Sequence, residues 1–142
     1  MDLELMDKFK RAYLMEEEMA SVLIQLCKSN PSIFKTLEKG QKIFRILTRI
    51  ENDTLFHKQM IEKVLDIKDS DDNKPEVKPI ADVKEFTGRL RQLYASDKNA
   101  FDIYNDIRKE VVDGTLKNNL AKMIKEENIH AKLSKKMLTW LE

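Results

Sequence analysis

The sequence predicts an all-α protein, a four-helix bundle made of two helical hairpins joined by a long crossover linker. Short breaks at 30–31 and 113–114 divide each half of the chain, and a polar stretch at about 66–80 separates the halves. Only three glycines and three prolines occur in 142 residues, too few for a β protein rich in turns. We expect one domain over residues 1–142. Apolar residues recur every three or four positions in four segments, at about 3–28, 32–65, 81–112 and 115–141.

The first predicted helix places a carboxylate among apolar residues. Glu17 falls on one line with apolar side chains, whereas Glu16 and Glu18 point about 100° to either side of that line. A solvated acidic triplet is the alternative interpretation. Because Phe9 and Ala20 flank the line, we expect Glu17 to face the interior of the bundle.

The second predicted helix carries polar residues where aliphatic residues would otherwise continue its inner seam. Pro31 ends the preceding helix, and the new helix runs to about Leu65 with a kink near Gly40. Thr54 and His57 occupy seam positions. A single buried histidine is usually a hydrogen-bonded core residue, so His57 alone does not indicate a metal ligand.

The predicted linker is polar and contains two prolines, which stop helix formation. The alternation of Asp69, Asp71 and Asn73 could indicate a calcium loop. That loop requires a glycine where this chain has Lys74 and a bidentate glutamate where it has Ile80. We therefore exclude a calcium loop.

The third predicted helix, at about 81–112, has Asp97 in the middle of its apolar stripe. The alternative is that Asp97 is a surface residue of the helix. Gly114 is suited to a left-handed C-cap that ends this helix, and Thr115 can cap the fourth helix, which runs to about Leu141.

The fourth predicted helix contains the motif Glu127-x-x-His130. Residues three apart lie on the same face of a helix, and here that face is the apolar one. A carboxylate in an apolar stripe is costly unless it is paired or bound to a cation. Glu-x-x-His also occurs by chance, with the glutamate exposed and the histidine packed.

The two halves of the chain repeat one pattern. Glu17 precedes Thr54-x-x-His57 in the first half, and Asp97 precedes Glu127-x-x-His130 in the second. Each separation is long enough to go up one helix, turn, and return to the same height at 1.5 Å per residue. All the inward polar residues should therefore meet at one level of the bundle.

This arrangement resembles the ferritin-like superfamily, especially the rubrerythrin-type four-helix domain, over nearly the whole chain. That resemblance implies two iron ions held by a carboxylate on the first and third helices and by Glu-x-x-His on the second and fourth. The implied metal ligands are Glu17, His57, Asp97, Glu127 and His130. Iron is the expected metal, as one or two ions, with zinc and manganese as alternatives. Ligand histidines must be neutral, so affinity should fall as the pH drops through about 6.5.

Two departures from the family pattern weaken one metal position. Thr54 stands where the family has a bridging glutamate, and Asp97 is one methylene shorter than glutamate. One hypothesis is therefore an iron-binding protein with oxidoreductase chemistry on oxygen or peroxide. In that case Tyr13 or Tyr104 is a redox neighbour, although both fit a role as core aromatics. The other hypothesis is a metal-free structural or interaction module that keeps the bundle and a buried hydrogen-bond network.

Charge and composition exclude other classes of function. The 26 basic and 25 acidic residues are interspersed, which disfavours nucleic-acid binding and a polybasic membrane surface. No apolar run is long enough for a membrane span, and the acidic N-terminus does not resemble a secretory signal, so we expect a cytoplasmic protein. The single cysteine, Cys27, excludes an intramolecular disulfide and a multi-cysteine metal site. We also expect a homodimer, with Phe34, Phe44 and Leu55 off the inner line of the second helix.

Overall fold

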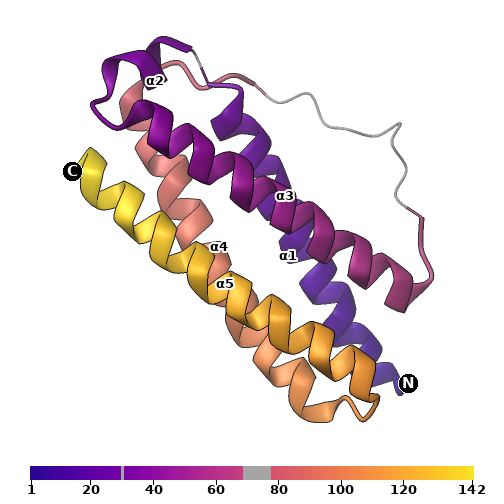
Figure 1. The fold of residues 1–142 in the computed structure, drawn as a ribbon. Helices are drawn as coiled ribbons and strands as arrows, with labels where there is room; N and C mark the ends of the chain where they lie inside the picture. Colours follow the sequence, from indigo (N-terminus) through magenta and orange to yellow (C-terminus); the bar gives the residue numbers. More distant parts are fainter. Residues whose placement is uncertain (30, 69–77) are drawn as a thin grey trace.

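The computed structural model describes residues 1–29, 31–68 and 78–142, and these residues form helices and no strand. The four long helices pack as a bundle, and a long linker connects α3 to α4 (Figure 1). The predicted fold class is confirmed. The middle of the linker, including most of the excluded calcium loop, lies outside the described residues. The helices are α1 (Leu3–Cys27), α2 (Pro31–Thr36), α3 (Gly40–Leu65), α4 (Val83–Glu110) and α5 (Gly114–Leu141).

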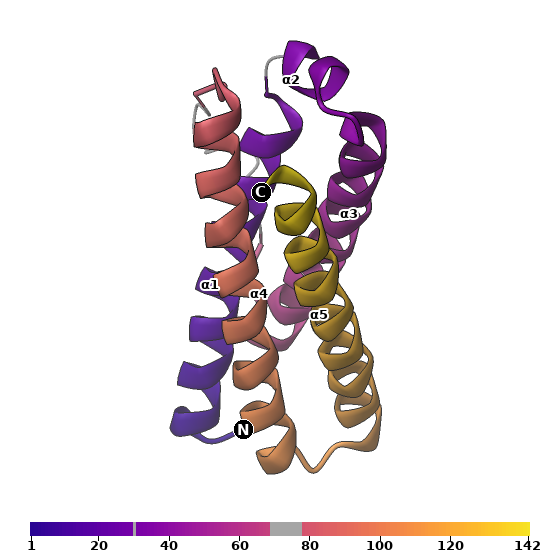
Figure 2. The same ribbon diagram turned by 90° about the vertical axis from the view of Figure 1, so that its left-hand side faces the viewer.

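The four long helices differ in how closely they pack. Helix α1 packs along α3 and along α4, and α5 packs most extensively along α4. Helices α3 and α5 also lie next to each other but make far fewer contacts than the other adjacent pairs (Figure 2). The seam between α3 and α5 is therefore the loosest side of the bundle.

Aspartates begin three of the long helices. The carboxylates of Asp2, Asp82 and Asp113 each accept a hydrogen bond from a backbone N–H three residues later, at 2.7–2.8 Å. Such caps satisfy N–H groups that have no partner within the helix. The predicted cap at Thr115 is wrong, because Asp113, two residues earlier, caps α5. Gly114 is the first residue of α5 and has no positive φ, so its predicted role as a left-handed C-cap is also wrong.

The second predicted helix is two helices rather than one kinked helix. Pro31 starts α2, which ends at Thr36, and α3 begins at Gly40. A Cβ built on Gly40 would lie 1.7 Å from the carbonyl oxygen of Phe34. Only a residue without a side chain lets the two backbones approach this closely.

We expect Gly40→Ala to destabilise the protein by about 1–3 kcal/mol, because the added methyl group must displace backbone. Gly88→Ala is the matched control. Gly88 lies exposed within α4, and its Cβ would meet no atom within 4 Å. Alanine there should stabilise the protein by about 1 kcal/mol, the usual difference in helix propensity. Urea unfolding of both variants measures the two changes, and equal effects would contradict this account of the turn.

The interior of the bundle is apolar at both ends, with Phe9 and Phe86 among its fully buried side chains. No described helix combines the length and the apolar character that crossing a membrane requires.

Phe44 and Leu55 are each 43% exposed, whereas Phe34 packs edge-on against Phe44 and Phe86. The homodimer stays a prediction, and light scattering at high micromolar concentration would test it.

Candidate metal centre

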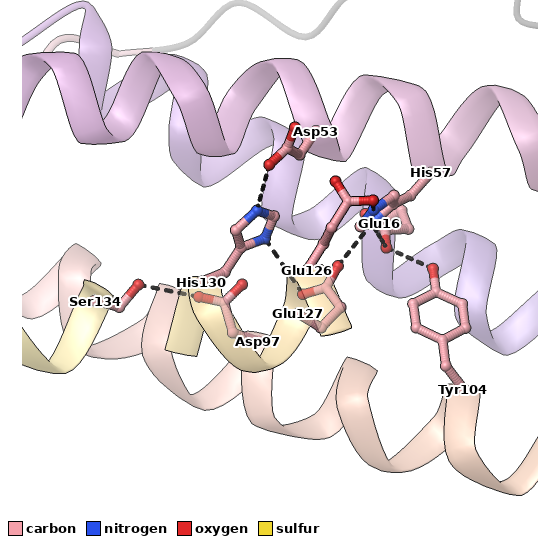
Figure 3. Close-up of polar contacts among 9 residues, drawn as sticks. All are labelled: Glu16, Asp53, His57, Asp97, Tyr104, Glu126, Glu127, His130 and Ser134. Carbon is pink, nitrogen blue, oxygen red and sulfur yellow. Dashed lines mark hydrogen bonds and ion pairs between the residues drawn. The ribbon is translucent and has the colours of Figure 1, made fainter. Parts of the chain in front are cut away.

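A layer of polar side chains crosses the middle of the apolar interior (Figure 3). Each of the four long helices contributes at least one residue, and every member is at most 2% exposed. We call this set the buried polar layer: Glu16, Thr54, His57, Asp97, Tyr104, Glu127, His130 and Ser134.

The structure places four of the five predicted metal ligands in this layer, and Glu17 is the exception. Glu17 is exposed, whereas Glu16 is fully buried. The prediction that Glu17 faces the interior is therefore wrong. The buried face of α1 follows steps of three and four through Leu5, Phe9, Ala12, Glu16, Met19, Leu23 and Leu26. Following that line through the sequence would have identified Glu16.

The first group of candidate ligands, the Glu16 cluster, consists of Glu16, His57 and Glu127. Each residue offers one ligand atom, and the three atoms lie within 4.8 Å of one another. His57 Nδ1 lies 2.8 Å from Glu127 Oε1 and 3.4 Å from Glu16 Oε1. Tyr104 donates its hydroxyl hydrogen to Glu16 Oε1 at 2.5 Å. Tyr104 therefore contacts a candidate ligand directly, whereas the hydroxyl of Tyr13 bonds to Glu62.

The second group, the Asp97 cluster, consists of Asp97, Glu127 and His130, again with ligand atoms within 4.8 Å of one another. His130 Nδ1 lies 3.7 Å from Glu127 Oε2, and Ser134 donates a hydrogen bond to Asp97 Oδ2 at 3.0 Å. Glu127 belongs to both clusters. Its two oxygens face different histidines, which is the position of a bridging carboxylate.

Sequence reasoning missed Asp53, which precedes Thr54 on α3. Its Oδ2 lies 2.8 Å from His130 Nε2, the ring nitrogen on the side away from Glu127 (Figure 3). A histidine that binds a metal through one nitrogen usually donates its other N–H to a carboxylate or carbonyl. Asp53 is therefore placed to orient His130. The apolar pattern of α3 contains no signal for this role, because Asp53 lies beside the apolar stripe of that helix rather than on it.

Six buried side-chain atoms of this layer have no hydrogen-bond partner among the described residues. A buried polar atom without a partner costs about 1–3 kcal/mol, so six in one layer require an explanation. The Asp97 cluster has one such atom on each of its three residues. The six atoms are Glu16 Oε2, Thr54 Oγ1, His57 Nε2, Asp97 Oδ1, Glu127 Oε2 and His130 Nδ1.

Burial and mutual contact shift the pKa values of these groups strongly. Burial, together with the charge of Glu127, raises the pKa of Glu16 to about 7 and raises that of Asp97 well above its usual range. Burial lowers the pKa of His57, but hydrogen bonds with Glu127 and Glu16 outweigh it and raise the pKa to about 10. In Glu127, burial favours the neutral form, but the neighbouring imidazoles of His130 and His57 outweigh it and lower the pKa to about 2. Without metal, the layer therefore holds an ionised Glu127 beside a protonated His57.

These shifts make the metal-free protein less stable as the pH rises above about 5. The folded-state pKa of Glu16 lies above its ordinary value of 4.5, and that of His57 lies above 6.5, so the folded protein binds more protons than the unfolded chain between pH 4.5 and 10. The contribution of Glu127 is complete above pH 4.5 and is lost only as the pH falls towards 2. We expect the melting temperature in the presence of a chelator to fall from pH 5 to pH 9. Circular dichroism measures it, and a melting temperature that rises over this range would contradict the assigned protonation states.

Comparisons with protein-family models, with curated proteins and with solved structures found no match. The feature of the molecule that indicates a function is the geometry of the buried Glu and His clusters, which could hold a metal ion.

Proposed function

We propose that this protein binds a transition metal ion, expected to be iron, in the buried polar layer. The observation that carries the proposal is the Asp97 cluster. Each of its three residues is buried, each offers a ligand atom within 4.8 Å of the others, and each has one side-chain atom without a hydrogen-bond partner. A bound cation would satisfy these atoms together.

The donor set favours a divalent transition metal. Carboxylate oxygens and imidazole nitrogens suit iron and manganese, and zinc also accepts this combination. The proposed ligands are Glu16, His57, Asp97, Glu127 and His130. Glu17 is replaced by Glu16 in this set, because only Glu16 reaches the layer.

The two clusters should differ in affinity. In the Asp97 cluster, Asp53 holds the outer nitrogen of His130, which leaves Nδ1 directed towards Glu127. In the Glu16 cluster, Tyr104 already bonds to one oxygen of Glu16, and His57 Nδ1 already pairs with Glu127. We therefore propose that the first ion binds at the Asp97 cluster and that a second ion binds more weakly.

Iron held by these residues would supply a redox-active centre for chemistry on dioxygen or peroxide. The protein's part would be to hold the ion, exclude bulk water and keep a proton near Tyr104 and Glu16. Stopped-flow absorbance after mixing the ferrous protein with hydrogen peroxide tests this oxidoreductase role. A rate no faster than that of free ferrous iron would exclude it without affecting metal binding.

Metal binding itself is tested by anaerobic titration of the metal-free, untagged protein with Fe²⁺, followed by Zn²⁺ as the control ion. We expect saturation at one ion per chain before any weaker second event. Absence of saturable binding by both ions would exclude the proposal.

A second candidate function is a metal-free structural module. The hydrogen bonds His57–Glu127, His130–Asp53, Ser134–Asp97 and Tyr104–Glu16 favour it, because they satisfy part of the layer without a metal. Six unpartnered atoms remain, and a cation at the Asp97 cluster would satisfy three of them together. Metal binding is therefore the better supported function.

A further inference from the structure

Two partly exposed carboxylates, Asp53 and Glu126, lie at the seam between α3 and α5. Their side chains are 27% and 24% exposed, whereas His57 and His130 behind them are at most 2% exposed. We call Asp53 and Glu126 the outer carboxylates. They lie between the buried histidines and the surface at the loosest side of the bundle.

The outer carboxylates cross the seam in opposite directions. Asp53 of α3 contacts Nε2 of His130 on α5 at 2.8 Å, and Glu126 of α5 lies 3.6 Å from Nε2 of His57 on α3 (Figure 3). The two imidazole rings stack with their centroids 6.1 Å apart and their planes 25° from parallel. Each histidine therefore has one ring nitrogen facing Glu127 and the other facing an outer carboxylate.

The contact between Glu126 and His57 is incomplete. His57 Nε2 is buried and has no hydrogen-bond partner among the described residues, since 3.6 Å exceeds hydrogen-bond distance. Its Nδ1, in contrast, is 2.8 Å from Glu127. An unpartnered nitrogen beside a carboxylate that solvent reaches is a place where a cation can be held briefly by one oxygen and one nitrogen.

We infer that a divalent cation enters the buried polar layer through the α3–α5 seam, and that Glu126, with Asp53 beside it, is the first group to hold the ion. This inference deepens the proposed metal binding and depends on it. The backbones of α3 and α5 approach each other less than those of the other adjacent long helices, so this seam leaves the most room for an ion to pass. Negative charge at the entrance raises the local concentration of cations and so the rate of association.

The test measures how fast Zn²⁺ reaches the histidines of the metal-free, full-length protein. Zn²⁺ that displaces a proton from a ligand histidine releases that proton to solvent, so stopped-flow mixing with a pH-indicator dye in weak buffer follows the ion's arrival. Glu126→Gln removes the charge and keeps the size of the side chain. Asp102→Asn is the matched control, because Asp102 is an exposed carboxylate of α4 in the shallow groove between α4 and α5.

We expect Glu126→Gln to slow association about tenfold at low salt, an effect of the size that electrostatic steering produces, and the difference should shrink as salt is added. Release of Zn²⁺ to a chelator should slow by a similar factor, because an ion that leaves the layer passes the same carboxylate as an ion that enters it. Asp102→Asn should associate at the wild-type rate.

Two results would overturn the proposed entry route through the α3–α5 seam. One is an association rate for Glu126→Gln equal to that of Asp102→Asn while the wild type binds Zn²⁺ normally. The other is faster release of Zn²⁺ at an unchanged association rate, which would make Glu126 a ligand. Failure of the wild-type protein to bind Zn²⁺ at all would instead overturn the proposed function.

Discussion

Replacing Glu127 with alanine is expected to abolish metal binding, because Glu127 is the residue that both clusters share. Its two oxygens face His57 and His130 at 2.8 and 3.7 Å. Removing it leaves each cluster with one carboxylate and one histidine, and it deletes the anion at the centre of the layer. We expect the affinity for Fe²⁺ and Zn²⁺ to fall by at least about 100-fold, since loss of a ligand exceeds the 10–100-fold effect of losing a supporting hydrogen bond.

Calorimetric titration of wild type and Glu127→Ala measures this loss. The matched control is Glu17→Ala, which removes an exposed glutamate one residue from Glu16 and should bind as the wild type does. Glu127→Ala should also melt at a lower temperature without metal, because a buried protonated His57 loses its partner. Equal affinity of Glu127→Ala and wild type would exclude these clusters, whatever the change in stability.

Metal affinity is expected to rise steeply with pH between 7 and 9. Without metal, the pKa of His57 is about 10 and that of His130 is raised, because Glu127 holds both rings in the protonated form. An ion that binds either ring must displace its proton, so the dissociation constant should fall about tenfold per pH unit for each proton released. Below pH 7 Glu16 is also protonated, so an ion that binds at the Glu16 cluster must displace that proton as well.

The sequence led us to expect that affinity would fall as the pH drops through about 6.5, and the contacts of the two histidines move this range to higher pH. An isolated histidine titrates there, but a histidine paired with a buried carboxylate titrates higher. Calorimetry in two buffers with different ionisation enthalpies counts the protons released when Zn²⁺ binds. An affinity that is constant from pH 7 to pH 9, with no proton release, would contradict the assigned protonation states.

The parts of the site that sequence reasoning found were those with regular helical spacing. Glu127 and His130 lie on one face of an uninterrupted helix, and the matching positions of Thr54, His57 and Asp97 followed from the repeat between the two halves. All five side chains are buried in the same layer. A long, periodic helix fixes which residues share a face, so this part of the site could be predicted.

The wrong predictions concern adjacent residues of which either could face the interior, and residues whose role depends on contacts between helices. In the run Glu16-Glu17-Glu18, each residue points about 100° away from the next. A choice that is wrong by one residue therefore exchanges a buried glutamate for an exposed one. Asp53 could not be found in this way, because its role comes from reaching across to α5. The split of the second helix depends on the approach of Gly40 to the Phe34 carbonyl, a contact that periodicity does not encode.

The most direct measurement of the central claim is a crystal structure of the protein soaked in Fe²⁺ or Zn²⁺, with anomalous scattering recorded at the metal's absorption edge. We expect the strongest anomalous peak within ligand distance of Asp97, Glu127 and His130, and a weaker one beside Glu16 and His57. A map in which the metal lies only on the surface, with the hydrogen bonds of the buried polar layer unchanged, would contradict metal binding at these clusters and leave the structural module as the function.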